Sequence, residues 1–177
     1  SGIAGFGRGT GRAYACPGNH EAKSFRGDPE GYAAYVDGIR ACGVVWLEAA
    51  SVVADVRGTR VSLTGFPSWM PGHPPAAFTA PLSSDFSVAL AHNPDAVLDM
   101  PEGAFDLVLS GHFHGGQIWA PFDLEYRLLR KERLCKAGIR RGLHIVNGMK
   151  LYIGRGVGNV VFPFRFLSPP EATILTL

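Results

Sequence analysis

The chain has few cysteines, few charges and no long apolar run. Its three cysteines, Cys16, Cys42 and Cys135, lack CxxC spacing, which argues against a disulfide framework and a structural zinc ribbon. No window approaches the roughly 20 apolar residues of a membrane-spanning helix. Charged residues make up 18% of the 177 residues and the net charge is +2, so charge alone does not predict nucleic-acid binding.

The beginning of the chain lacks acidic residues and histidines. Residues 1–18 contain no Asp, Glu or His, and the chain opens on Ser1 without an initiator methionine or a signal-peptide apolar region. A Gly/Arg-rich lead-in that runs straight into a strand predicts a start cut from a longer protein. The hydrophobic content of 46% and the length predict a single folded domain over residues 1–177.

The residue pattern predicts mostly strands with few helices between them. Apolar spacing and the following Gly43 predict a helix over 29–42, and a second, short helix is expected within 127–136. Residues 67–81 contain five prolines and are expected to form an irregular surface loop. Strands are expected at 12–16, 44–47, 52–56, 61–66, 86–91, 107–110, 143–146, 150–153 and 172–177. This pattern favours a layered α/β or α+β fold.

Three of the expected strands end in turns that carry histidine. The turns read PGNHE around His20, AHNPD around His92, and SGHFHGGQI around His112 and His114. In an extended segment, residues i and i+2 point the same way, so His112 and His114 are expected to face one pocket. Imidazole nitrogens are good ligands for transition metals. Each turn alone also fits ordinary hydrogen-bonded histidines, but three such turns together predict a site.

The order of these motifs resembles the calcineurin-like metallophosphoesterase superfamily. The strings PGNHE, AHNPD, LSGHFHGGQIW and GRGVGNVVFPFRFLSPPEATIL resemble more narrowly the YaeI/YkuE-like bacterial phosphoesterase family. The resemblance implies an α/β (α+β) fold, a four-layer metallophosphoesterase β-sandwich flanked by helices. Phe113 departs from the family, which usually has a small polar residue there.

The resemblance implies a site for two divalent metal ions, which in such enzymes are Mn, Zn, Fe or Ni. Asn19, His92 and His112 would bind one ion, and His114 would bind the other. His20 would be catalytic, stabilising the transferring phosphoryl group or protonating the leaving oxygen, and Glu21 would orient His20. Two such ions activate water and polarise a phosphoryl group.

The family pattern also includes an Asp-x-His motif and a Gly-Asp pair that precede Asn19 in the family, and neither is present before Asn19 in this sequence. We therefore expect a domain truncated at the N-terminus, with its N-terminal strands missing. Family members often carry an N-terminal membrane anchor or export signal, so membrane association is expected through the missing segment. The resemblance implies a bacterial protein that is cytoplasmic or membrane-associated rather than secreted.

The expected substrate is a phosphomonoester or phosphodiester, and lipid-linked phosphodiesters are a specific hypothesis. Trp69 and Trp119 lie near the motif loops in sequence and would form an apolar rim for such a substrate, although ordinary loop packing also explains them. The basic run 127–141 is interpreted as a solvated face. Two alternatives stay open: a non-catalytic scaffold that binds a protein partner, and a single-metal hydrolase that uses the histidines alone.

Overall fold

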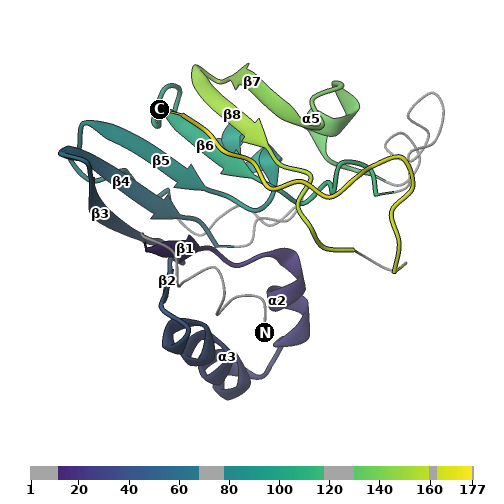
Figure 1. Ribbon diagram of the computed structural model, residues 1–177, viewed down its shortest axis with the longest axis horizontal. Helices are drawn as coiled ribbons and strands as arrows, with labels where there is room; N and C mark the ends of the chain where they lie inside the picture. Colours follow the sequence, from purple (N-terminus) through teal and green to yellow (C-terminus); the bar gives the residue numbers. More distant parts are fainter. Residues whose placement is uncertain (1–11, 68–77, 118–129, 160–162, 177) are drawn as a thin grey trace.

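The computed structural model describes residues 12–67, 78–117, 130–159 and 163–176. These residues form two β-sheets (Figure 1). The smaller sheet pairs β1 (Ala13–Ala15) in parallel with β2 (Val44–Trp46). The larger sheet has the strand order β3-β4-β5-β6-β8-β7. Its strands are β3 (Ala50–Val56), β4 (Thr59–Gly65), β5 (Phe86–Leu90), β6 (Leu107–Ser110), β7 (Gly142–Val146) and β8 (Met149–Ile153).

The inner strands of the larger sheet run in the same direction. β4, β5, β6 and β8 are paired in parallel, whereas β3 and β7 are antiparallel to their neighbours. A tight turn at Arg57 and Gly58, with φ of 55° and 86°, joins β3 to β4, as in two-residue hairpins whose twist matches the strands. Because the inner strands are parallel, their carboxyl ends share one edge, which is where ligand sites form in such sheets.

The helices form two groups. α2 (Asn19–Ser24) and α3 (Pro29–Ala41) lie beside the smaller sheet, and the 3-10 helix η1 (Pro94–Asp99) and α5 (Arg133–Lys136) lie against the larger sheet near β6 and β8 (Figure 1). The Asp28 carboxylate accepts a hydrogen bond from the Gly31 N–H at 2.9 Å, and Pro29 follows it, so α3 begins as the capping rules predict.

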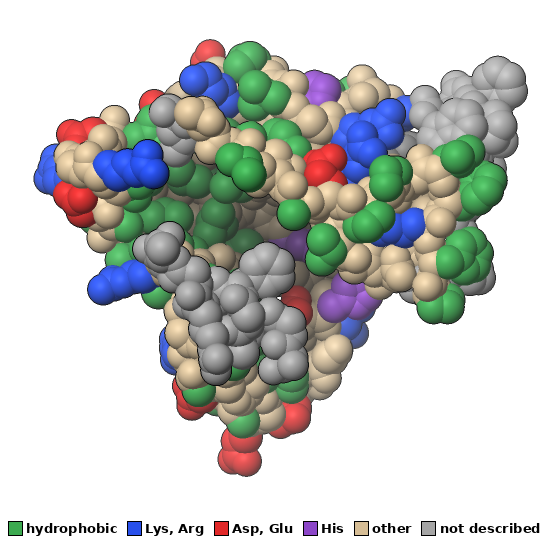
Figure 2. Space-filling model, viewed as in Figure 1, with side chains coloured by type: hydrophobic (Ala, Val, Ile, Leu, Met, Phe, Trp, Pro, Cys, Tyr) green, Lys and Arg blue, Asp and Glu red, His purple; other side chains and the backbone are tan. Residues whose placement is uncertain are grey.

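The main core lies between one face of the larger sheet and the η1–α5 layer. It contains Phe66, Ala89, Ala91, Ala96, Val97, Met100, Phe105, Val108, Phe113, Leu134, Cys135, Met149, Leu151 and Ile153. The opposite face carries an apolar groove of about 780 Å³, lined by β3–β6 and β1. Figure 2 shows this hollow lined by hydrophobic side chains, with histidine side chains reaching the surface beside it.

The two sheets meet at Gly65, the last residue of β4. A Cβ at this position would lie 2.2 Å from the Leu47 carbonyl oxygen, so any side chain would force the sheets apart. Leu47 in turn donates its N–H to the Ala15 carbonyl at 2.8 Å. This close approach brings the end of β1, and the Asn19 turn after it, towards the carboxyl edge of the larger sheet.

The structure confirms the mixed α/β fold and most of the expected elements. The strand expected at 172–177 is wrong for the described residues 172–176, which pair with no other strand. Residues 68–77 of the expected loop lie outside the described residues. None of the helices in the described ranges has the length and apolar character needed to cross a bilayer.

Candidate metal centre

The first histidine turn is held by the Glu21 side chain. Its carboxylate accepts the Gly18 N–H at 2.9 Å and the Tyr35 hydroxyl at 3.3 Å. These two bonds fix the start of α2, where Asn19 is half-buried and His20 is exposed. Glu21 therefore orders the turn that carries both residues.

The turn after β5 is ordered by its own side chains and also holds α5. The Asn93 amide oxygen accepts the Asp95 N–H at 3.0 Å. Asp95 is 1% exposed, and its carboxylate accepts the N–H groups of Arg133 and Leu134 at 2.6 and 2.9 Å. His92 and the start of α5 are thus tied to the same short segment.

The turn after β6 is not extended, so the expectation that the two histidines share a face through strand geometry is wrong. His112 and His114 have φ of 67° and 52°, and Gly115 and Gly116 follow with φ of 64° and 68°. Non-glycine residues rarely adopt this left-handed backbone, which costs of order 1–3 kcal/mol each and clusters at functional sites. Phe113 between the histidines is fully buried in the core.

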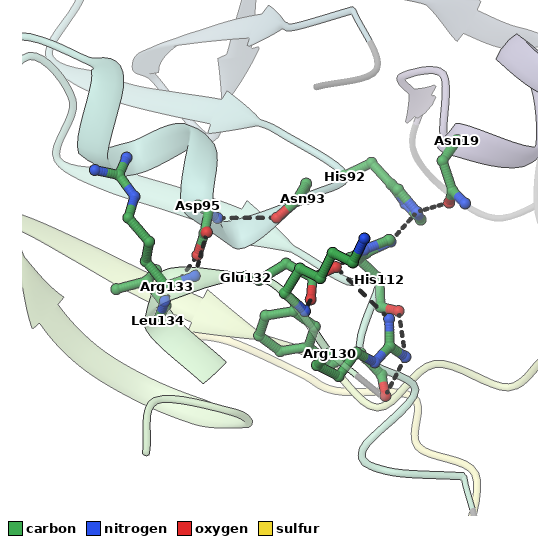
Figure 3. A network of polar contacts seen from close by, with 11 residues as sticks. Asn19, His92, Asn93, Asp95, His112, Arg130, Glu132, Arg133 and Leu134 are labelled. Atoms are coloured by element: carbon green, nitrogen blue, oxygen red, sulfur yellow. Dashed lines mark hydrogen bonds and ion pairs between the residues drawn. The ribbon is translucent and has the colours of Figure 1, made fainter. Parts of the chain in front are cut away.

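Three side chains from the three turns converge at one point (Figure 3). His92 Nε2 lies 2.8 Å from Asn19 Oδ1 and 3.2 Å from His112 Nδ1. On the far side of the ring, His112 Nε2 lies 2.8 Å from the Glu132 carboxylate. The structure therefore brings together Asn19, His92 and His112, which the sequence assigned to one metal ion.

The other predicted site residues do not join the cluster of Asn19, His92 and His112 directly. His114 Nδ1 lies 3.4 Å from the Gly158 carbonyl oxygen, and the charges of His20 and His114 both act on His92. Their side chains are thus near the cluster without a direct contact among the described residues. Trp69 and Trp119 lie outside the described residues.

Burial favours the neutral form of His92 and of His114. It lowers the pKa of His92 to about 4, with the charge of His112 acting in the same direction. Burial also lowers the pKa of His114, against a hydrogen bond to the Gly158 carbonyl. Burial raises the pKa of Glu132, but hydrogen bonds to His112 and to the backbone outweigh it and lower the pKa to about 2. At neutral pH the site therefore holds neutral imidazoles at His92 and His114 and a charged carboxylate at Glu132.

The candidate metal-ligating atoms of Asn19, His92 and His112 fit a divalent metal ion of intermediate softness. Ligand atoms that each lie about 2.0–2.2 Å from one ion are roughly 3 Å apart, and Asn19 Oδ1 and His112 Nδ1 lie 2.8 and 3.2 Å from His92 Nε2. The set contains an amide oxygen and two imidazole nitrogens. In the described ranges, no group of three or more His, Cys, Asp or Glu side chains is disposed to hold a metal. The fit therefore rests on Asn19 completing the pair of histidines.

Sequence reasoning missed Glu132 and Arg130. The interpretation of 127–141 as a solvated face is wrong for Glu132, which is 7% exposed. Arg130 lies over the Phe113 ring at 5.6 Å and donates to the His112 and Phe113 carbonyl oxygens at 3.4 Å. The available signal was that Glu132 is the one acidic residue in this basic run.

The chain is similar to several bacterial metallophosphoesterases. It is 35% identical over 122 residues to the uncharacterized metallophosphoesterase YkuE of Bacillus subtilis, covering 68% of this chain and 41% of YkuE. It is 30% identical over 166 residues to the phosphodiesterase YaeI of Escherichia coli, covering 93% of this chain and 57% of YaeI. It is 34% identical over 106 residues to the UDP-2,3-diacylglucosamine pyrophosphatase LpxG of Chlamydia muridarum, covering 58% of this chain and 32% of LpxG.

No protein-family model and no solved structure matches the chain. The mixed sheet, the histidine turns at its carboxyl edge and these relatives together define the class of protein. The chain belongs to the calcineurin-like metallophosphoesterase family. Membership implies divalent metal cofactors. The matches cover between 32% and 57% of the three relatives described.

Proposed function

We propose that the complete protein is a metal-dependent phosphohydrolase that cleaves phosphomonoesters or phosphodiesters. The observation that carries the proposal is the convergence of three side chains, with Asn19 Oδ1 at 2.8 Å and His112 Nδ1 at 3.2 Å from His92 Nε2. They come from three turns at strand ends that are far apart in sequence. The names of YaeI, a phosphodiesterase, and LpxG, a pyrophosphatase, support the same chemistry.

Each residue has a role in this proposal. Asn19, His92 and His112 hold one divalent ion and His114 holds a second. Divalent ions at such a site neutralise phosphoryl oxygens and lower the pKa of water. His20, exposed at the same turn as Asn19, stabilises the phosphoryl group or donates the proton to the leaving oxygen. Glu21 holds the turn that carries Asn19 and His20 in place through its hydrogen bonds to Gly18 and Tyr35.

We further propose a lipid-linked phosphodiester as substrate. An apolar loop after β8 exposes Val157, Phe164, Phe166 and Leu167 to between 52% and 65%. Arg165 in this loop donates to the His114 carbonyl at 3.0 Å, and Gln117 donates to the Phe164 carbonyl at 3.0 Å. The loop is therefore attached to the turn that carries His114. Exposed apolar side chains beside a site are suited to an acyl chain, and LpxG is named for a diacylated substrate.

Metal stoichiometry tests the first proposal. The chain is loaded with Mn²⁺ or Zn²⁺, dialysed and measured by elemental analysis. We expect bound metal that decreases in His112→Ala and His92→Ala. His144→Ala is the matched control, because His144 lies on β7 and, among the described residues, contacts the Arg141 carbonyl at 2.9 Å rather than the cluster. The same measurement on the complete protein decides the proposal: a complete protein without bound metal would contradict it and favour the non-catalytic scaffold.

Substrate competition tests the second proposal. In the complete protein, Phe164→Ser with Phe166→Ser should lower turnover of a long-chain acylated phosphodiester about tenfold relative to bis(p-nitrophenyl) phosphate, because apolar contact with the chain is lost. Leu143→Ser with Ile145→Ser is the control, since both are exposed on β7 at 61% and 69%. Equal effects on both substrates would exclude the lipid hypothesis. Trp69→Ala and Trp119→Ala are tested in the same assay.

A further inference from the structure

Glu132 is a buried acid in the most basic part of the chain. It immediately precedes α5, between Lys131 and Arg133, and its side chain is only 9% exposed. Burying a carboxylate is costly unless both oxygens find partners. One Glu132 oxygen lies 2.8 Å from His112 Nε2, and the other accepts the Lys131 N–H at 3.0 Å. The Arg130 guanidinium lies 3.9 Å from the first oxygen.

The contact with Glu132 determines which nitrogen of His112 carries the proton. A charged carboxylate only accepts hydrogen bonds, so His112 Nε2 must be the protonated donor. In a neutral imidazole the other nitrogen then keeps its lone pair. That nitrogen, Nδ1, faces His92 Nε2 at 3.2 Å, where the three predicted ligand atoms converge (Figure 3). The tautomer set by Glu132 is therefore the one that binds a metal.

The position of Glu132 is itself tied to the histidine turns. Asp95 accepts the N–H groups of Arg133 and Leu134, the two residues that follow Glu132, at 2.6 and 2.9 Å. Asp95 lies three residues after His92 in the same turn. One segment thus holds the ligand His92 directly and His112 through Glu132.

We propose that Glu132 is a positioning residue that holds His112 in the tautomer and orientation needed to bind the metal ion. This inference rests on the proposed function, because it assumes that His112 is a ligand. Carboxylates behind metal-binding histidines raise ligand basicity, and their loss typically costs 10–100-fold in metal affinity.

Two measurements on the metal-free chain test the proposal. Calorimetric titration with Mn²⁺ gives the affinity, and long-range ¹H–¹⁵N correlation spectra give the tautomer of His112. We expect His112 protonated at Nε2 in the wild type, and a tautomer mixture with 10–100-fold weaker Mn²⁺ binding in Glu132→Ala. Glu132→Gln retains the shape and one acceptor oxygen, so its affinity should fall between the two.

Asp106→Asn is the control. Asp106 lies just before β6 and accepts the N–H and hydroxyl of Ser87 at 2.8 and 2.7 Å, so it tests the loss of a hydrogen-bonded carboxylate away from the site. It should change neither readout. If the wild type binds neither Mn²⁺ nor Zn²⁺, the proposed function and this inference both fail. If the wild type binds Mn²⁺ and both Glu132 variants bind it equally well, or if Glu132→Ala keeps the Nε2 tautomer, only this inference fails.

Discussion

The turn after β5 and the turn after β6 both carry histidines at the same sheet edge, but they are stabilised in opposite ways. The β5 turn has no left-handed residue over 92–95 and is ordered by its own side chains, Asn93 and Asp95. The β6 turn has four left-handed residues over 112–116. Its carbonyl groups are held from outside, by Arg130, Arg165 and Ser168.

The difference shows how a strained turn is kept in place. Left-handed backbone at His112 and His114 costs free energy. The turn has two hydrogen bonds of its own, from Phe113 N–H to the Gly111 carbonyl at 2.8 Å and from Gly116 N–H to the Phe113 carbonyl at 2.9 Å, and contacts from outside add to them. Arg165 contacts the His114, Arg155 and Gly158 carbonyls, so it joins the turn to the loop after β8. The β5 turn instead supports other elements, because Asp95 caps α5. The geometry of the proposed ligand His112 therefore depends on distant residues, and that of the proposed ligand His92 on local ones.

The largest expected effect is at the side chain of the β6 turn that packs in the core. Phe113 is fully buried in the main core, so Phe113→Ala should lower the free energy of unfolding by about 3–5 kcal/mol. Urea denaturation of the metal-free chain measures this loss. A cost below about 1 kcal/mol would mean that the turn is held by its outside contacts alone.

The second largest effect is expected where the β5 turn is hydrogen-bonded to the start of α5. Asp95→Asn replaces a buried charged acceptor by an amide that faces two N–H donors, and should cost about 2–3 kcal/mol. Asp106→Asn is the control, because Asp106 also accepts two hydrogen bonds but is exposed. Equal losses for the two variants in urea denaturation would show that Asp95 does not support α5.

The fold was largely predictable because its signals are local. The spacing of Tyr32, Val36 and Ile39 predicted the helix that is α3, and alternation around Arg57 and Gly58 predicted the β3–β4 hairpin. The strand expected over 172–177 was wrong because alternation alone does not supply a pairing partner. Within the described residues 172–176, Tyr152 bonds to the Thr173 side chain instead.

The candidate site was predictable only in part. Motifs indicate the proposed ligands, whereas the residues that hold those ligands in place are brought near them only by tertiary contacts. Asn19, His92 and His112 stand in motif strings, and the structure brings them together. Glu132 lies 20 residues from His112 in the chain, and its place as the one acid of a basic run does not indicate which residue it contacts. The left-handed backbone of the β6 turn was also missed, since its histidines read as strand residues.

A pH titration of stability compares the two turns through their histidines. The folded-state pKa of His92 is about 4, below its ordinary value of 6.5. The unfolded chain therefore binds a proton that the folded chain does not, and stability present above pH 6.5 is lost as pH falls towards 4. The loss should be on the order of 2 kcal/mol. It is measured by urea denaturation of the metal-free chain at several pH values.

Variants assign this pH dependence to a turn. His92→Gln should remove most of the slope between pH 6.5 and 4, because Gln does not titrate. His114→Gln should remove less of the slope than His92→Gln. Burial lowers the pKa of both histidines, but the charge of His112 is the second cause for His92 and only the last for His114. A slope that survives His92→Gln unchanged would assign it to groups outside the β5 turn.

The smallest effect is a difference between two alanine variants that tests how closely neighbouring residues pack against the β6 turn. Gly115 and Gly103 have similar left-handed φ, 64° and 66°. A Cβ at Gly115 would lie 2.8 Å from Arg155 Cγ and 2.9 Å from Ser168 Oγ, whereas one at Gly103 would meet nothing within 4 Å. Both alanine variants should lose about 1 kcal/mol to backbone strain. Gly115→Ala should lose roughly 1 kcal/mol more, because Arg155 and Ser168 must move. Equal losses of stability in the two variants would mean that Arg155 and Ser168 move at little cost. The β6 turn would then be stabilised mainly by its own residues, as the β5 turn is.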